Sequence, residues 1–388
     1  MTSLRGQVAI VGAADTEVGK VAHMSATQLC IDAAQRALRD AGIGKDDVDG
    51  LVTCNSMAEP HMYHAEAMAE YLQIFPKYCV SAGAGGGTTF AVLYQAASAI
   101  AHGICETVLI SMADSLRSGL TREQAMVMQS SSGHPQYETP YGSTVPGYYA
   151  LIAQAYMHEY GVTREQLASV AVTCREHASL HPGAQMRDPI TVDDVIESRL
   201  IADPLRLLDC SLVSDGGAAI VLTSAERAKD FPHQPVYLLG AGEGHGHEHI
   251  SQARSLTTSA ARESGERAYA MAGLGPDDMD LVQVYDCFTP VVLIELEDLG
   301  FCAKGEGGAF VAEGHTRIGG RLPMNTHGGL LSHCHPGNPG SMFALTETVT
   351  QLRHAAGERQ VAGAETALVH AQGGILSSHC SVILGRER

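Results

Sequence analysis

Ala-Gly-Ile-Gly-Lys-Asp-Asp-Val-Asp-Gly-Leu-Val at residues 41–52 is nearly repeated as Ala-Gly-Leu-Gly-Pro-Asp-Asp-Met-Asp-Leu-Val-Gln at residues 272–283. Each copy follows an Ala-rich stretch with the pattern of a helix, 26–40 and 259–271, and leads into an apolar stretch typical of a strand. The copies are much further apart than the units of a solenoid or propeller. We therefore predict a duplicated domain whose active site lies where the two halves meet.

A second repeated pair supports the duplication, since Glu106-Thr-Val-Leu-Ile recurs as Glu365-Thr-Ala-Leu-Val. From these repeats we expect a first half at 1–228 and a second half at 235–388. Apolar strands alternate with helices in both halves. This pattern predicts an α/β fold built from βαβ units with a mostly parallel sheet.

Residues 115–150 interrupt this alternation, because they are rich in Ser, Gly, Pro, Gln and Tyr. The stretch is too long for a plain connection between elements, and helices expected near 148–160 and 164–178 extend it. The second half has no counterpart. We therefore predict a lid or binding insertion, at about 115–200, in the first half alone.

The composition excludes several classes of protein. A net charge of −18 without any Lys/Arg run argues against nucleic-acid or anionic-membrane partners. No apolar run approaches the ~18 residues of a membrane span. Ten Cys without CxxC spacing, and an expected strand that begins near Val8, indicate a cytoplasmic protein with reduced thiols and no signal peptide.

The two copies differ at the carboxyl end of the matched strand, where ligands bind in open α/β sheets. The first copy has Cys54-Asn55 there, and the second has Tyr285-Asp286-Cys287-Phe288. Tyr285 and Cys287 can both reach a crevice if the chain bends at this point. The alternative is a buried Tyr beside a structural Cys, since free Cys is among the most buried residue types.

A loop with three His residues is the second candidate, Asn325-Thr-His327-Gly-Gly-Leu-Leu-Ser-His333-Cys-His335-Pro-Gly. Gly328 and Gly329 permit close approach of the backbone to a ligand. An imidazole at this place can act as a base or donate to a developing oxyanion. Function and packing remain alternative explanations of this loop.

The third candidate is Gly86-Gly87-Thr88-Thr89, which begins a helix of the first half. Free amides and the helix dipole favour negative charge there, and a nucleophile at such a turn is activated. No nucleophile stands at Gly86 or Gly87, and the Thr hydroxyls need an adjacent base. Tight helix packing explains the glycines equally well.

His245-Gly-His247-Glu-His249 has residues that bind metals, but it lacks a partner motif at a recognised spacing. We expect a solvated loop there, and the sequence predicts no metal site.

With these features in place, the chain resembles the thiolase superfamily, and within it the thiolases related to sterol carrier protein. The resemblance covers nearly the whole chain. It is strongest in Tyr160-Gly-Val-Thr-Arg-Glu-Gln-Leu-Ala, Ser198-Arg-Leu-Ile-Ala-Asp-Pro-Leu-Arg-Leu-Leu-Asp and Ser214-Asp-Gly-Gly-Ala-Ala. It implies an αβαβα layered sandwich of two mixed βαβ halves. It also implies an enzyme that binds acyl-coenzyme A and makes or breaks the carbon–carbon bond β to the thioester.

Two motifs of the family imply roles for single residues. Residues 325–336 match its Gly-Gly…Gly-His-Pro loop, which places His335 on the catalytic His. Tyr285-Asp-Cys-Phe matches its His-Asp-Cys-Phe motif, which makes Cys287 the acid/base at the acyl Cα.

The chain departs from the thiolases at two of these positions. The nucleophilic Cys of thiolases falls at Gly86, and the His of the motif is replaced by Tyr285. Both changes resemble the thiolase-like aldolases that shorten steroid side chains in bacteria. Those enzymes cleave a β-hydroxyacyl-CoA without a covalent intermediate, use tyrosines, and require a small zinc-ribbon/OB-fold partner. One of their tyrosines matches Tyr285, whereas the other falls at His335, where this chain keeps the thiolase residue.

We therefore predict a (retro-)aldolase of lipid metabolism that acts on a β-hydroxyacyl-CoA. Tyr285 or His335 takes the hydroxyl proton, the other holds the thioester oxyanion, and Cys287 returns a proton to the enolate carbon. His335 is the easier base, because a Tyr would need a substantially lowered pKa. The alternatives are a 3-ketoacyl-CoA thiolase or acyltransferase with an atypical nucleophile, such as Cys79, and a non-catalytic acyl-CoA- or lipid-binding subunit.

The remaining site residues are expected to form an oxyanion and substrate loop: Gly86, Gly87, Thr88, Asn325, His327, Gly328 and Gly329. The coenzyme A thioester is the expected substrate, and no bound cofactor is expected. The resemblance also implies a homodimer that associates through the sheets of the first halves, and the OB-fold partner subunit of the aldolases.

Overall fold

Strand β1 (Val8–Asp15) lies at the centre of the molecule and joins its two halves. It pairs with β7 (Asp215–Ser224) on one side and with β8 (Val236–His245) on the other. The computed structural model describes residues 4–388, so the first three residues of the expected first half lie outside the described residues.

The strands of the two halves follow the same order. In the first half the order is β3 (Tyr78–Ala82), β2 (Gly50–Cys54), β4 (Thr107–Ser115), β7 and β1. In the second half it is β9 (Leu281–Gln283), β10 (Thr366–Gly373), β11 (Ser378–Gly385) and β8. The repeated sequences thus occupy equivalent places, whereas β3 has no counterpart. The limits 1–228 and 235–388 stay a prediction.

The expectation of a mostly parallel sheet is wrong. The parallel pairs are β2–β3, β2–β4 and β9–β10, and the other neighbours are antiparallel. A short turn joins β10 to β11, and such a connection permits only antiparallel pairing. The prediction of parallel strands failed because helices cover both faces of the sheet. Antiparallel strands are then buried on both sides and also have unbroken apolar sequences.

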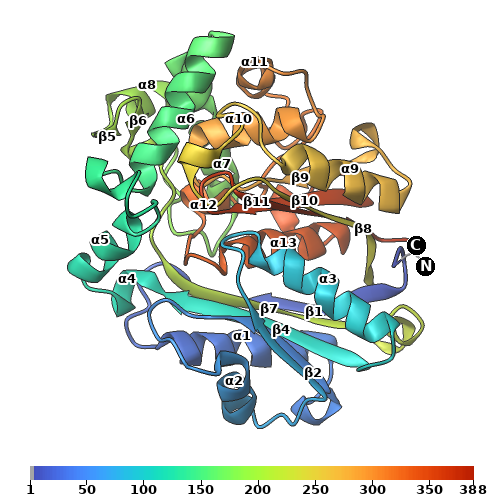
Figure 1. The fold of residues 1–388 in the computed structure, drawn as a ribbon. Coiled ribbons are helices and arrows are strands. Elements are labelled where there is room, and N and C mark those ends of the chain that lie inside the picture. Colours follow the sequence, from blue (N-terminus) through green and yellow to red (C-terminus); the bar gives the residue numbers. More distant parts are fainter. Residues whose placement is uncertain (1–3) are drawn as a thin grey trace.

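The nine strands form one continuous sheet, and its parts in the two halves are here called the first sheet (β3 to β1) and the second sheet (β8 to β9). Helices separate and cover these two parts, which gives five layers (Figure 1). Helices α1 (Ala26–Ala41) and α2 (His64–Leu72) cover the outer face of the first sheet. Helices α9 (Ala261–Ala272) and α10 (Thr289–Asp298) lie on the outer side of the second. Between the sheets run α3 (Thr88–Ala101) and α13 (Gly340–Leu352). This mixed α/β arrangement confirms the predicted αβαβα sandwich.

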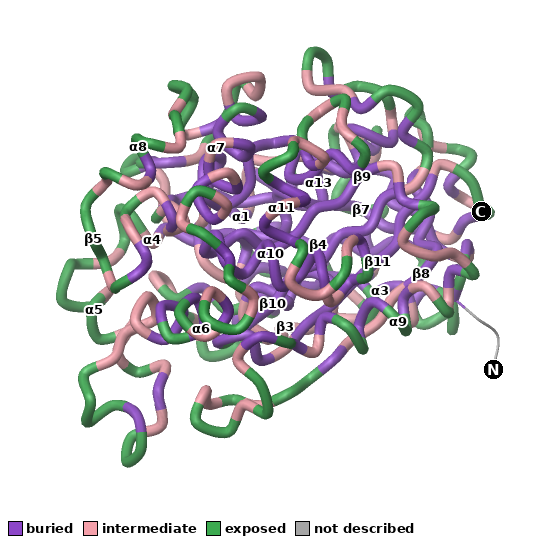
Figure 2. Tube along the Cα trace, turned by 90° about the horizontal axis from the view of Figure 1, so that it is seen from above, coloured by how far each residue is buried: buried purple, intermediate pink, exposed green. Residues whose placement is uncertain are grey.

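The core follows the middle layer, and Figure 2 shows buried residues through the centre and exposed ones at the rim. Nearly every residue of α13 is buried, including polar ones such as Glu347 and Gln351. A helix without a solvent face belongs inside a protein. Within α13, Gln351 Nε2 donates to Glu347 Oε1 at 2.9 Å.

Local signals in the sequence were read correctly at α1. Ser25 and Gln28 form a capping box, and Gly42 ends the helix with φ of 71°. Strand β3 was not predicted; it is an edge strand whose residues are only half-buried, so it lacks the apolar run of the inner strands.

The insertion between β4 and β7 packs on the second half. Its main helices are α5 (Arg122–Ser130), α6 (Val145–Tyr160), α7 (Arg164–Leu180) and α8 (Val192–Glu197). Helix α7 contacts α10, α11 (Gly307–Ala312) and α12 (Gly329–Ser332). Within residues 4–388, no helix combines the length and apolar character that a membrane crossing requires.

Candidate active site

Residues 284–288 connect β9 to α10 and carry both predicted side chains, Tyr285 and Cys287. Asn325 accepts a hydrogen bond from the Val284 amide at 2.9 Å and donates to the Val284 carbonyl at 3.1 Å. The Tyr285 amide donates to Glu295 Oε2 at 2.8 Å. These bonds fix the connection and hence the directions of its side chains.

Asp286 anchors the same connection to the His-containing loop. Its carboxylate accepts hydrogen bonds from the amides of Leu330 at 2.8 Å and Leu331 at 3.1 Å. A Cβ on Gly329 would lie 2.0 Å from Asp286 Oδ2, so only Gly allows this approach.

The ring of Tyr285 occupies the space beside Gly86. A Cβ on Gly86 would lie 2.4 Å from both Cε2 and Cζ of Tyr285, and 2.5 Å from the Gln372 carbonyl oxygen. Such distances lie far inside van der Waals contact. A side chain at position 86 and the present position of Tyr285 therefore exclude each other.

His335 completes a hydrogen-bonded pair with Tyr285. The Tyr285 hydroxyl lies 3.0 Å from His335 Nε2, and Ser211 Oγ lies 2.9 Å from Nδ1. Burial lowers the pKa of His335 to about 4, and burial followed by the nearby Cys287 raises the pKa of Tyr285. Both groups are therefore neutral at pH 7. The arrangement that fits has Nδ1–H donating to Ser211 and Tyr285 donating to Nε2.

Cys287 is buried beside polar groups that the sequence did not indicate. Gln372 Nε2 donates to Cys287 Sγ at 3.3 Å and to the Tyr149 hydroxyl oxygen at 2.6 Å. The ring of Tyr149 stacks on Phe288 with 4.5 Å between centroids. Burial raises the pKa of the Cys287 thiol, so the thiol is protonated. Gln372 lies near the carboxyl end of β10, so a comparison of strand ends across the repeat could have identified it. Tyr149 lies in the insertion, and no motif in the sequence indicated it.

The other predicted residues of the His-containing loop lie behind this pair. Asn325 is fully buried on Val284, and Gly328, with φ of 104°, lies against Ala178. His327 is buried, and its ring lies 5.2 Å from that of His333. The two bonds between Asn325 and Val284 position the connection that carries Tyr285, and a direct oxyanion role for Asn325, His327 and Gly328 stays a prediction.

The turn at the start of α3 uses most of its own donors. The amides of Gly87 and Thr88 donate to the carbonyls of Ala84 and Gly85, and the Thr88 hydroxyl donates to Gly85 at 2.6 Å. Ser341 donates to the Gly86 carbonyl at 2.6 Å. Thr88 thus has no hydroxyl proton free for catalysis.

Cys79 lies on β3, where it lines a surface hollow with Glu66 and Phe75. Burial and the Glu66 charge raise the pKa of its thiol, the opposite of what a nucleophile requires. The hollow beside Tyr285 is small, with a cavity volume of about 10 Å³, and is lined by His327, Ser341 and His370 among others.

The run of His245, His247 and His249 does not converge on one point. His245 pairs with Glu243 at 3.2 Å, His247 with the Ile375 carbonyl at 2.9 Å, and the ring of His249 lies against His134.

Comparison with known proteins decides the family. The model of the thiolase N-terminal domain matches residues 8–226, and the thiolase C-terminal domain-like model matches residues 242–386. The chain belongs to the thiolase family. Among thiolase relatives, it is 39% identical over 402 residues to a steroid side-chain-cleaving aldolase of Thermomonospora curvata, with 100% of both chains covered.

Two further thiolase relatives bear on the chemistry. The chain is 36% identical to an acetyl-CoA acetyltransferase of Methanothermobacter thermautotrophicus, over 95% of this chain and 96% of that one. The solved structure of the Ltp2-ChsH2(DUF35) aldolase matches with a TM-score of 0.89 and 37% identity, covering 100% of both chains. The predicted resemblance to thiolase-like aldolases is thereby confirmed.

Proposed function

We propose that this thiolase-family protein is a non-covalent retro-aldolase that cleaves a β-hydroxyacyl-CoA into an acyl-CoA and a ketone or aldehyde. One observation carries the proposal. The Tyr285 ring fills the space beside Gly86, where thiolases have their nucleophile, and its hydroxyl pairs with His335 at 3.0 Å. The site thus has an acid/base pair, and no nucleophile stands at position 86.

The pair allows a proton relay. As the β-hydroxyl proton moves to the Tyr285 oxygen, Tyr285 passes its own proton to His335 Nε2. The Cα–Cβ bond then breaks, the β-carbon leaves as a carbonyl group, and its electron pair forms the thioester enolate. Tyr285 need not be ionised beforehand, which agrees with its raised pKa. Ser211 holds the imidazole in the tautomer that accepts.

The pH dependence follows from the neutral His335. A base works in its deprotonated form, and His335 stays deprotonated down to its pKa of about 4. We expect kcat/KM for cleavage to stay constant as the pH falls from 8 to about 5.5, although an exposed His becomes protonated in this range. A pH–rate profile with a stability check at each pH measures this. Half-maximal activity near pH 6.5 would contradict it.

Cys287 is proposed to protonate the enolate carbon, because it is a protonated thiol held by Gln372. We expect Cys287→Ala to lower the exchange of the Cα hydrogen of the product acyl-CoA in D₂O about 10²-fold. Mass spectrometry of the CoA ester measures the exchange. Cys54→Ala, which removes a buried thiol at the equivalent strand end, is the control. Equal exchange in wild type and Cys287→Ala would rule out this role.

The names of the relatives support the chemistry. One is a steroid side-chain-cleaving aldolase and one acts on acetyl-CoA, so a CoA thioester is the proposed substrate and a steroid acyl group is the first to try. The acetyltransferase relative favours a second candidate, acyl transfer. That reaction requires a nucleophile, and the contact between Gly86 and Tyr285 leaves no room for one.

Partner subunits are part of the proposal. Strand β3 is an edge strand that pairs with β2, and exposed Tyr63, Tyr71 and Phe75 lie on the neighbouring segment. We expect a homodimer through this edge. The aldolase structure matched above includes a ChsH2(DUF35) partner, and we expect a subunit of that kind here. Ten cysteines, all without disulfides, support a cytoplasmic location.

The test is product analysis. The protein, alone and with any co-purifying partner, is incubated with β-hydroxyacyl-CoA esters bearing steroid, aryl and short aliphatic groups. Release of a carbonyl compound and a shortened CoA ester supports the proposal. Turnover of β-ketoacyl-CoA with free CoA, and none of the hydroxyacyl esters, would overturn it.

A further inference from the structure

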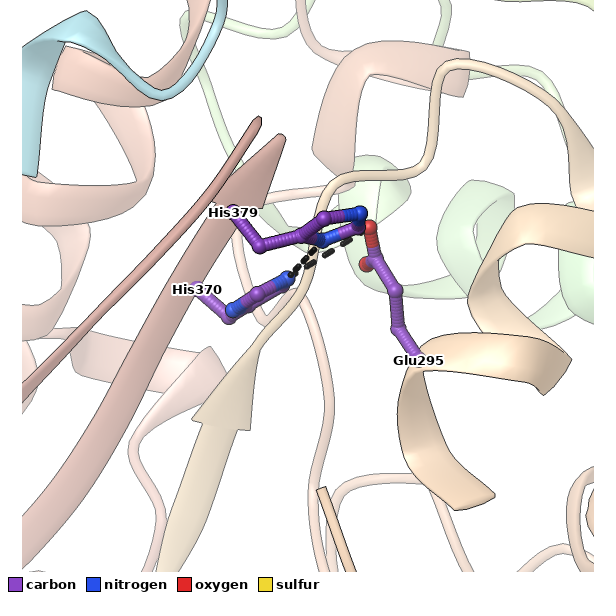
Figure 3. A group of neighbouring side chains, drawn as sticks. All are labelled: Glu295, His370 and His379. Carbon is purple, nitrogen blue, oxygen red and sulfur yellow. Dashed lines mark hydrogen bonds and ion pairs between the residues drawn. The ribbon is translucent and has the colours of Figure 1, made fainter. Parts of the chain in front are cut away.

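Three buried side chains meet directly behind the Tyr285 connection (Figure 3): Glu295 of α10, His370 of β10 and His379 of β11. All three are fully buried. One ligand atom from each lies within 4.8 Å of the others. None of them was singled out by the sequence, because their positions along the chain match no linear motif.

The hydrogen bonds inside this cluster do not satisfy its members. His370 Nε2 lies 3.1 Å from His379 Nδ1, so one proton lies between the two rings. Glu295 Oε1 lies 3.7 Å from His370 Nε2, too far for a hydrogen bond. Within residues 4–388, Glu295 Oε1 and His379 Nε2 have no hydrogen-bond partner. Buried polar atoms without partners are unfavourable and call for an explanation.

Hydrogen bonds hold the outward-facing atoms of His370 and Glu295. His370 Nδ1 pairs with Ser381 Oγ at 2.8 Å, and Ser381 pairs with Ser264 of α9 at 2.8 Å. Glu295 Oε2 accepts the Tyr285 amide. Metal ligands in proteins are oriented by such outer hydrogen bonds, which leave the other nitrogen or oxygen free for the ion.

We propose that Glu295, His370 and His379 bind a divalent cation of the zinc type. Two His and one Glu are a known zinc ligand set, and zinc bonds of 2.0–2.1 Å place tetrahedral ligands about 3.3 Å apart. The observed separations of 3.1 and 3.7 Å lie on either side of this value. The ion ties β10 and β11 to α10, and through Glu295 it fixes the amide of Tyr285. The proposed cation site does not depend on the aldolase reaction.

Metal content tests the proposal. The untagged full-length protein is expressed in zinc-supplemented cells, and inductively coupled plasma mass spectrometry measures zinc per chain. We expect about one ion per chain in the wild type, and background levels in His379→Gln and Glu295→Gln. The triple variant His245→Asn, His247→Asn and His249→Asn controls for the surface histidines and should keep its zinc.

Thermal unfolding distinguishes a bound ion from the alternative, in which Glu295 is a buried neutral carboxyl group that binds no metal. Gln at position 295 keeps the acceptor for the Tyr285 amide, so without an ion Glu295→Gln leaves Tm unchanged or raises it. If an ion is bound, Glu295→Gln removes one of its ligands and lowers Tm. Visible absorption bands of tetrahedral Co²⁺ in cobalt-grown wild type give a second readout that needs no variant. Wild type without metal, or metal lost only in the surface variant, would overturn the proposal.

Discussion

Tyr285→Phe is expected to lower kcat for retro-aldol cleavage by about 10²–10⁴-fold, the range for loss of a general acid/base group. The substitution removes the hydroxyl that bonds to His335 Nε2 and leaves the ring that fills the space beside Gly86. The fold should therefore persist while the relay is broken. Steady-state kinetics on a β-hydroxyacyl-CoA, with Tm as the check on folding, measures the effect.

Tyr269→Phe is the matched control, because it removes a hydroxyl of α9 that donates to the Leu299 carbonyl, outside the site. It should keep kcat near wild type. If Tyr285 and His335 act as one unit, Tyr285→Phe combined with His335→Ala is no slower than the slower single variant. A wild-type kcat in Tyr285→Phe would show that cleavage does not use the proton relay between Tyr285 and His335.

Gly86→Cys restores the residue that the thiolase resemblance expects, and we predict that it lowers the rate of cleavage about 10²-fold without creating a thiolase. The new Cβ would lie 2.4 Å from the Tyr285 ring, so the ring must move away from His335. A displacement of this kind costs about 10²-fold in rate, and the overpacking costs roughly 1–3 kcal/mol of stability. Activity assays on both substrate types and denaturant unfolding measure the two effects.

Gly86→Ala should lose as much activity as Gly86→Cys, because the clash comes from Cβ and not from the thiol. Gly83→Ala, in the same turn, is the control, since a Cβ at Gly83 meets no atom within 4 Å. Thiolysis of a β-ketoacyl-CoA by Gly86→Cys, with Tyr285 in place, would contradict the steric argument.

The sequence revealed the features that depend on neighbouring residues or on repetition. The capping residues of α1 and the repeated Asp-Asp segments could be read directly, and they led to the duplicated α/β fold. The meeting of Tyr285 with His335 was implied by the family resemblance, and the structure places them in contact.

What the sequence could not show are contacts set by tertiary packing. Tyr149 meets Gln372 across 223 residues of chain, and no periodic pattern encodes such a contact. The Glu295 cluster likewise forms only when α10 packs on the β10–β11 hairpin. The prediction of a mostly parallel sheet failed for a related reason. A strand buried on both faces has the same apolar sequence whether the neighbouring strand is parallel or antiparallel.

The central claim is that cleavage proceeds without a bond between protein and acyl group. Intact-protein mass spectrometry during turnover, with β-hydroxyacyl-CoA in one sample and β-ketoacyl-CoA plus CoA in another, tests it directly. We predict carbonyl release from the hydroxy substrate with the protein mass unchanged throughout. An acyl adduct that forms and decays at the rate of turnover would contradict the account.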